Sequence, residues 1–168
     1  AEKMKSLAEK LSQMQMDNAM AQEQENLDDL RDILENLITL SFEQEALMKN
    51  FRNVNQSDPR YVILSQKQLK LKDDSKVIKD SLMALAKRVY QIESFVTREV
   101  GEMNTYMDES LEALKSRRID IATGKQQYAM TSINNLALML NEALQQMQEQ
   151  AKKKSGKPGN GSCNKPGG

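Results

Sequence analysis

The sequence predicts an all-α protein, an antiparallel four-helix bundle with long helices, and three observations lead to this prediction. The 168 residues are rich in good helix formers such as Leu, Ala, Met, Gln, Glu and Lys, without runs of β-branched residues. The seven glycines and three prolines are few, and most lie in the last thirteen residues. Apolar residues recur at alternating spacings of three and four, the repeat of nearly aligned packed helices.

Residues 1–24, AEKMKSLAEKLSQMQMDNAMAQEQ, form the first predicted unit, a Met-rich amphipathic helical extension. Four apolar residues lie on one helical face at spacings of three, four and three: Met4, Leu7, Leu11 and Met14. We interpret this face as a candidate partner-binding surface, because methionine suits adaptable apolar contacts. A copper(I) site is disfavoured, because leucines are mixed into the same stripe. The pattern leaves open whether the segment projects as a stalk or folds over the rest.

The helical domain, residues 25–152, begins with a helix predicted within residues 25–58. Asn26 is a candidate N-cap, and Asp28 and Asp29 suit the positive end of the helix dipole. The stripe of this helix alternates spacings of three and four throughout. It consists of Leu30, Ile33, Leu37, Leu40, Gln44, Leu47, Phe51 and Val54.

The motif NQSDPRY predicts a break before the second helix. Asp58 would cap this helix, and Pro59 would take the first helical position, where its missing N–H costs nothing. Residues 59–89 carry eight basic and three acidic groups, whereas residues 25–58 carry three and eight, so we expect the lysines to lie beside the acidic first helix. The second stripe consists of Leu64, Gln68, Leu71, Ser75, Ile78, Leu82, Leu85 and Val89.

The apolar frame shifts at Ile92, which predicts a bend or short turn at residues 89–92 and a third helix after it. No Gly or Pro marks the break, so one helix over residues 59–118 is the alternative. Asp120 or Thr123 is the candidate N-cap of the fourth helix. The third stripe contains Val96, Val100, Met103, Met107 and Leu114; the fourth contains Met130, Ile133, Ala137, Leu140, Leu144 and Met147.

The fourth helix has few charges: between residues 121 and 151 only Lys125, Glu142 and Glu149 are charged. A half-exposed helix usually carries more charge, so we expect a second neighbour: the extension, a second copy, or another part of the protein.

Residues 153–168, KKSGKPGNGSCNKPGG, have too little apolar content to fold, and we expect them to form a disordered linker. The chain starts without an initiator Met and ends in this linker, so we expect a piece of a longer protein.

Composition disfavours several classes of function. The chain has no histidine, which removes the Glu-x-x-His metal sites of helical bundles and nucleophiles that need an imidazole base. The 24 basic and 24 acidic residues cancel, so no net field attracts nucleic acid. The longest uncharged run, residues 126–141, is too short to cross ~30 Å of hydrocarbon. We expect no enzyme, cofactor, metal, small-molecule substrate or nucleic-acid partner.

Polar residues interrupt the predicted core at four positions: Gln44, Gln68, Ser75 and Asn104. We interpret them as residues that fix the register between helices, as single polar core positions do in coiled coils. If they share one layer, they should hydrogen-bond to one another or to a buried water. A ligand cavity lined by these side chains is the alternative.

Four stretches carry a resemblance to a known family: NLDDLRDILENLITLSFEQEALM, DPRYVILSQKQLKLKDDSKVIKDSL, LAKRVYQIESFVTREV and AMTSINNLALMLNEALQQMQ. They resemble the helical core of a large bacteroidetal envelope protein family that is catalogued as a domain of unknown function. The tail GNGSCNKPGG resembles the linker of that family. The resemblance implies a periplasmic helical region of a membrane-anchored protein and assigns no catalytic residue. The chain departs from the family at Tyr90, where a proline is common.

Together these patterns predict a non-catalytic structural or assembly module of a membrane-anchored envelope protein. It would act through helix–helix contacts with other regions of the parent chain, with protein partners or in a homo-oligomer. The alternative is a peripheral membrane-binding module that uses residues 1–24 as an interfacial helix. That segment has three lysines, four acidic residues and no tryptophan, which disfavours the alternative.

Overall fold

The computed structural model describes residues 1–155, which form four α-helices and no strand. The helices are α1 (Glu2–Phe51), α2 (Arg60–Ala86), α3 (Tyr90–Lys115) and α4 (Ile119–Ser155). The predicted all-α class is confirmed. Because α4 continues to Ser155, the predicted start of the linker at residue 153 is wrong, and the rest of that linker, residues 156–168, lies outside the described residues.

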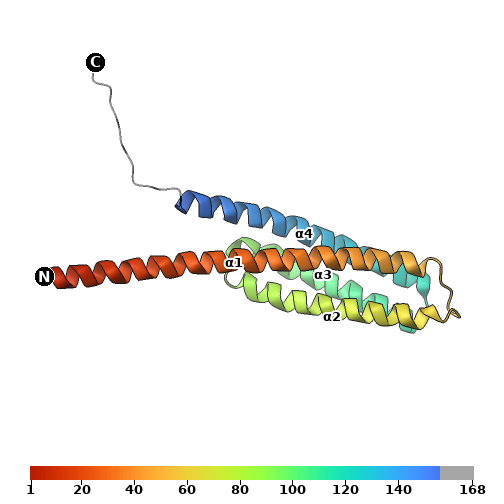
Figure 1. Cartoon of the computed structure of the whole chain (residues 1–168). Coiled ribbons are helices and arrows are strands. Elements are labelled where there is room, and N and C mark those ends of the chain that lie inside the picture. Colours follow the sequence, from red (N-terminus) through yellow and green to blue (C-terminus); the bar gives the residue numbers. More distant parts are fainter. Residues whose placement is uncertain (156–168) are drawn as a thin grey trace, which may run out of the picture.

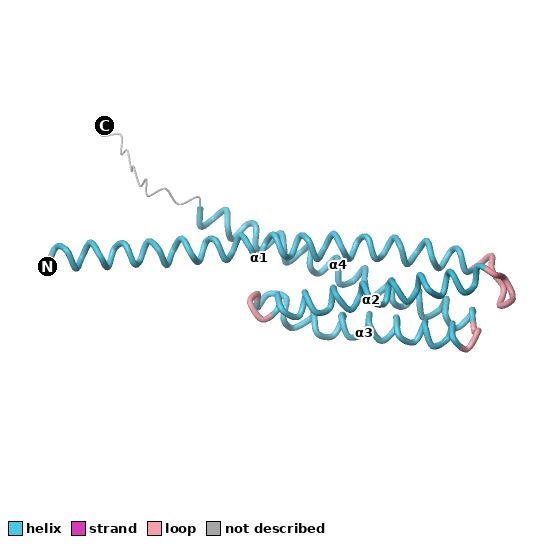
Figure 2. The backbone as a smooth tube through the Cα atoms, turned by 60° about the horizontal axis from the view of Figure 1, so that its bottom comes forward, coloured by secondary structure: helices cyan, strands magenta, loops and turns pink. Residues whose placement is uncertain are grey.

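The four helices pack in a ring. α1 lies against α2 and α4, and α3 lies against α2 and α4 (Figure 1). Figure 2 shows the short connections between consecutive helices, which run in opposite directions. The N-terminus of α1 and the end of α4 lie at the same end of the ring, where α1 projects far beyond the turn between α2 and α3 (Figure 1).

α1 is one continuous helix, so the predicted N-cap at Asn26 is wrong. The buried Asn26 side chain instead accepts hydrogen bonds from Gln22 Nε2 (3.1 Å) and from Arg88 Nε (3.2 Å) after α2. Good helix formers before Asn26 continue the helix outward, because adding residues to an existing helix carries no nucleation cost. Of the two arrangements left open for residues 1–24, the structure has the projecting one.

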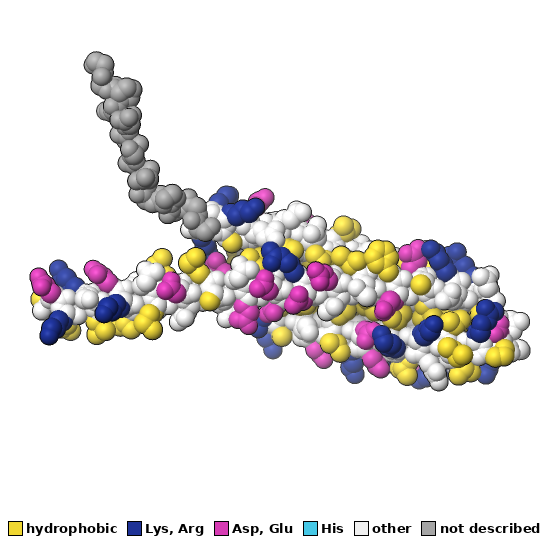
Figure 3. Space-filling model, in the orientation of Figure 1, with side chains coloured by type: hydrophobic (Ala, Val, Ile, Leu, Met, Phe, Trp, Pro, Cys, Tyr) yellow, Lys and Arg dark blue, Asp and Glu magenta, His cyan; other side chains and the backbone are white. Residues whose placement is uncertain are grey.

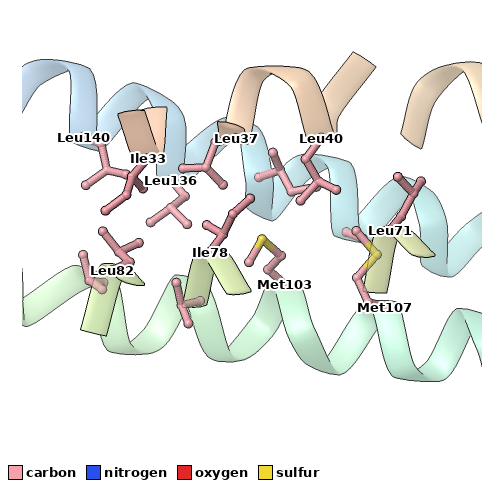
Figure 4. Packing of buried hydrophobic residues seen from close by; sticks show 14 of the residues in the cluster. Ile33, Leu37, Leu40, Leu71, Ile78, Leu82, Met103, Met107, Leu136 and Leu140 are labelled. Carbon is pink, nitrogen blue, oxygen red and sulfur yellow. The ribbon is translucent and has the colours of Figure 1, made fainter. Parts of the chain in front are cut away.

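The apolar seams predicted for α1 and α2 are buried along their whole length. Every residue of both stripes is at most 6% exposed, including the polar ones. Figure 4 shows Leu37 and Leu40 of α1 pointing into the space shared with α2, α3 and α4. Burying one such leucine contributes roughly 1.5–3 kcal/mol to the free energy of folding. These two seams and the buried α3 seam therefore supply most of the stability of the ring.

The seam of α4 differs from the predicted one. Met130 and Ala137 are only partly buried, whereas Ala129 and Leu136 face the core and are fully buried. The observed seam alternates four and three from Ala122 onward. It consists of Ala122, Gln126, Ala129, Ile133, Leu136, Leu140, Ala143 and the partly buried Met147.

The chain turns between α2 and α3 at residues 87–89, so the turn is present but begins two residues before the predicted one, and the single-helix alternative is wrong. Val89 leaves helical geometry (φ −125°, ψ 94°) and buries its side chain in the core. Arg88 NH2 pairs with Asp29 Oδ2 of α1 at 2.8 Å. A buried valine and a tethered arginine hold this turn without Gly or Pro.

The capping hydrogen bond predicted for Asp58 at the start of α2 is present: Asp58 Oδ1 accepts a hydrogen bond from the backbone N–H of Arg60 at 2.9 Å. α2 itself begins at Arg60, one residue later than Pro59. The caps predicted for α4 are wrong, because the helix begins at Ile119 and both Asp120 and Thr123 lie inside it. There the Thr123 hydroxyl donates to the carbonyl of Asp120 (3.0 Å).

The turn between α3 and α4 docks on the α1–α2 loop through Arg117. Its NH1 donates to the Gln56 carbonyl (2.6 Å), Gln56 Nε2 donates to the Arg117 carbonyl (2.5 Å), and its guanidinium lies 5.3 Å from the centre of the Tyr61 ring. Arg117 has a φ of 56°, which is strained for any residue with a Cβ. These contacts hold the strained backbone in place.

We therefore expect Arg117→Gly to be more stable than Arg117→Ala by about 1 kcal/mol. Both variants lose the side-chain contacts, but only glycine adopts the positive φ without strain. Urea denaturation followed by circular dichroism measures the difference. Equal stabilities, or a more stable alanine variant, would contradict the assignment of strain to this residue.

Candidate interaction surfaces and buried polar layer

A layer of three glutamines crosses the core, one each from α1, α2 and α4. Gln44 and Gln68 exchange two hydrogen bonds of 2.9 Å, amide to amide. Gln126 Nε2 donates to Gln68 Oε1 at 2.9 Å, and Gln68 Nε2 lies 3.3 Å from the sulfur of Met107 on α3. All three glutamines are fully buried. Each helix thus contributes one side chain, and a shift of any helix by one turn would break the layer.

The structure separates the other two predicted polar core residues from this layer. Ser75 is buried two turns further along α2, where its hydroxyl donates to the Lys72 carbonyl at 2.7 Å. Asn104 is only partly buried and donates to the Val100 carbonyl of its own helix at 3.0 Å, so the prediction of a core position is wrong for Asn104. Ser75 and Asn104 are joined by a long contact of 3.5 Å.

Gln126 was missed because the predicted α4 seam was set by Met130 and Ala137. Counting four and three from Ala122 to Ala129 would have placed Gln126 in the core, but alanine carries little signal of burial. The Oε1 atom of Gln126 has no hydrogen-bond partner among the described residues. This arrangement favours the hypothesis that the polar residues fix the register between helices over the hypothesis that they line a ligand cavity. The reason is that the glutamine side chains hydrogen-bond to one another across the helices.

The described residues offer no site for a metal ion: no group of three or more Cys, Asp or Glu side chains converges there. Within residues 1–155, no helix is long and apolar enough to span a bilayer.

Ion pairs between helices lie at the surface. The hydrogen bond to Asp108 on α3 raises the pKa of Lys72, and the bond to Glu109 on α3 raises the pKa of Lys125.

The basic residues of 59–89 lie beside the acidic α1 at two places: Arg88 pairs with Asp29, and Lys70 lines one surface groove with Glu43. The closest ion pairs of the α2 lysines are made elsewhere. Lys72 pairs with Asp108 of α3 at 2.8 Å, and Lys70 pairs with Asp74 of its own helix at 3.1 Å. The pairs are exposed or only partly covered, so each contributes little to stability.

The candidate partner-binding stripe lies on the part of α1 that projects beyond the ring. Its four side chains face solvent, with exposed fractions of 77, 58, 52 and 59% for Met4, Leu7, Leu11 and Met14. Figure 3 shows apolar side chains gathered on one side of this projecting segment. No residue of α2, α3 or α4 covers the stripe, so it is available for contact.

A second exposed apolar surface lies where α1 and α4 meet. The hydroxyl of Ser41 donates to Asn134 Oδ1 across the two helices at 2.8 Å. One turn from this bond, toward the same end of the ring, lie Ile38 on α1 and Leu138 on α4, with Leu138 70% exposed. Phe42, next to Ser41, is also exposed. The extension contacts the end of α4, where Lys154 donates a hydrogen bond to Glu23, but it projects away from this surface and does not cover it.

Comparison of the chain with protein-family models, with curated proteins and with solved structures finds no match.

Proposed function

We propose that this chain is a non-catalytic structural or assembly module that acts through helix–helix contacts. The observation that carries the proposal is the stripe of Met4, Leu7, Leu11 and Met14, which is half to three-quarters exposed on a helix that extends beyond its own core. Monomeric soluble proteins rarely keep a contiguous apolar surface without a partner for it. The regular spacing of three and four suits a partner that is itself a helix.

The ring of helices supports this role as a rigid base, and we infer that it is an antiparallel four-helix bundle. Its core is filled by leucine seams and by a polar layer whose members bond to one another. The chain contains no histidine, and the described residues hold no converging set of metal ligands. An enzyme, a cofactor and a small-molecule substrate are therefore no part of the proposal.

The proposed partners are other regions of the parent protein, separate protein partners or a second copy of the chain. They would contact the stripe and the exposed surface of Ile38, Phe42 and Leu138. The proposed location is the bacterial cell envelope, on its periplasmic side, which rests on the family resemblance. In this proposal, attachment to the membrane occurs through segments beyond residues 1–155.

Vesicle binding separates this proposal from the membrane-binding alternative. The full chain and a variant lacking residues 1–24 are sedimented with vesicles of phosphatidylethanolamine and phosphatidylglycerol. We expect neither to sediment, because the extension has three lysines against four acidic residues and no aromatic anchor. Binding by the full chain that is lost on truncation would overturn the proposal in favour of an interfacial helix.

A further inference from the structure

We propose that the extension pairs with the extension of a second copy, antiparallel and in one register. Met4 of one copy faces Met14 of the other, and Leu7 faces Leu11. This inference rests on the proposed function, because it names the partner of the same stripe.

The spacing of the stripe is self-complementary. A two-fold interface requires a surface that matches itself when it is reversed. The spacing of three, four and three reads the same in both directions, so all four apolar residues find apolar partners in a single register. A lipid surface or an unrelated helix would not require this symmetry.

The charges beside the stripe suit the antiparallel register. Lys3 directly precedes Met4, and Asp17 follows Met14 by three residues. These are the positions that flank facing core residues in an antiparallel pair, so Lys3 of each copy meets Asp17 of the other. On the opposite flank, Ala8 meets Ala8, and this small side chain lets the helices approach closely. Lys10 meets Lys10 at the centre, which weakens the contact.

A parallel pairing would bring like charges together. Continued with the same spacing, the stripe runs through Glu25, Asp28, Asp32 and Glu35, all of them exposed. Figure 3 shows acidic side chains gathered over this middle part of α1. In a parallel pair each of these carboxylates would face its own copy. In the antiparallel register the contact ends before residue 25, so the acidic row stays in solvent.

The geometry of α1 leaves room for the second copy. α4 ends beside the opposite side of the extension, where Met16 and Met20 line a groove with Lys153 and Lys154. Nine residues separate Leu7 from Met16, which at about 100° per residue puts the two side chains on opposite sides of the helix. The second helix therefore meets no part of the ring, and the two rings lie at opposite ends of the pair.

Light scattering on the full chain tests the pairing. The contact covers only residues 3–17, so we expect a reversible dimer with a dissociation constant of about 10–100 µM. At about 500 µM chain the measured mass should therefore approach twice the chain mass of 19.1 kDa. Leu11→Asp should restore the single-chain mass, while Ser12→Asp, which adds the same charge on the far side of the helix, should not. A wild-type chain of single mass, or a dimer indifferent to Leu11→Asp, would overturn the inference.

Charge exchange tests the register. Lys3→Asp alone or Asp17→Lys alone should weaken the dimer about tenfold, because two attractive pairs become repulsive. The double variant Lys3→Asp/Asp17→Lys should regain the wild-type affinity, and Lys10→Gln should strengthen the dimer. Failure of the double variant to recover would exclude this register.

Disulfide cross-linking tests the direction in a Cys163→Ser background. A mixture of Leu7→Cys and Leu11→Cys chains should form mainly the mixed disulfide, because these positions face each other only in the antiparallel pair. Predominant Leu7→Cys homodimers would indicate a parallel pair. A chain that is monomeric and does not bind vesicles overturns this inference alone, whereas vesicle binding through residues 1–24 overturns the proposed function as well.

Discussion

Leu140→Asp is expected to unfold the helical ring. Leu140 is fully buried on α4, in the layer where Figure 4 places it close to Ile33 and Leu136. An aspartate there would lose the packing of the leucine and bury a carboxylate without a partner. We expect the free energy of unfolding to fall by about 4 kcal/mol or more, out of a total of about 5–15 kcal/mol for a domain. A thermal melt by circular dichroism measures the loss.

Leu138→Asp is the matched control for this variant. Leu138 lies two residues away on the same helix and is 70% exposed, so the same change should alter the free energy of unfolding by about 0.5 kcal/mol or less. Melting temperatures that fall equally in the two variants would show that the burial assigned to α4 is wrong.

Gln68→Leu is expected to lower the free energy of unfolding by about 2–4 kcal/mol, although it makes the core more apolar. The change removes the hydrogen bonds that join Gln68 to Gln44 and Gln126, whose side chains are fully buried and so lose a partner away from bulk solvent. The triple variant with leucine at residues 44, 68 and 126 should recover most of this loss, because no amide is then left unpaired. Urea denaturation of the three proteins gives the comparison.

Gln66→Leu provides the control for the polar layer. Gln66 is exposed on the same helix, so its replacement should change the free energy of unfolding by about 0.5 kcal/mol or less. If Gln68→Leu were as stable as the wild type, the three amides would not form the bonded layer described for the core. If the triple variant lost cooperative unfolding, the layer would be shown to select one register of the helices.

Much of the ring could be predicted from the sequence, because long seams contain many independent positions. Each residue from Leu30 to Val54 and from Leu64 to Val89 that was placed on a seam is buried. A single wrong residue would not have shifted such a frame. The break before α2 was equally clear, because Asp58 and Pro59 act locally and need no tertiary contact.

Signals that depend on distant contacts were misread. Asn26 has the chemistry of an N-cap, but its amide bonds to Arg88, which is remote in sequence. The α4 seam was placed by its larger side chains, whereas alanines at residues 122, 129 and 143 are also buried in the core. Small residues are buried there because the helices approach each other, and a sequence read one helix at a time does not contain that information.

The candidate surfaces also differ in whether they depend on one helix alone or on contacts between helices. The stripe of the extension was visible in the sequence because it is a periodic feature of one helix. The polar layer was only half visible, since Gln44 and Gln68 interrupt long seams while Gln126 lies among alanines. The surface of Ile38 and Leu138 depends on how two helices meet, and only the low charge of α4 hinted at it.

Because α1 is one unbroken helix, the number of residues between the ring and the stripe determines the direction in which the stripe faces. The ring fixes the rotation of α1 at Leu27 and Leu30, and every residue added before that point turns the stripe by about 100°. An insertion of one residue near Gln22 would swing the stripe to another side of the molecule, whereas an insertion of seven would move it outward by about 10 Å and almost restore its direction. The direction of the stripe is therefore kept by insertions that are close to a whole number of helical turns, such as seven, eleven or eighteen residues.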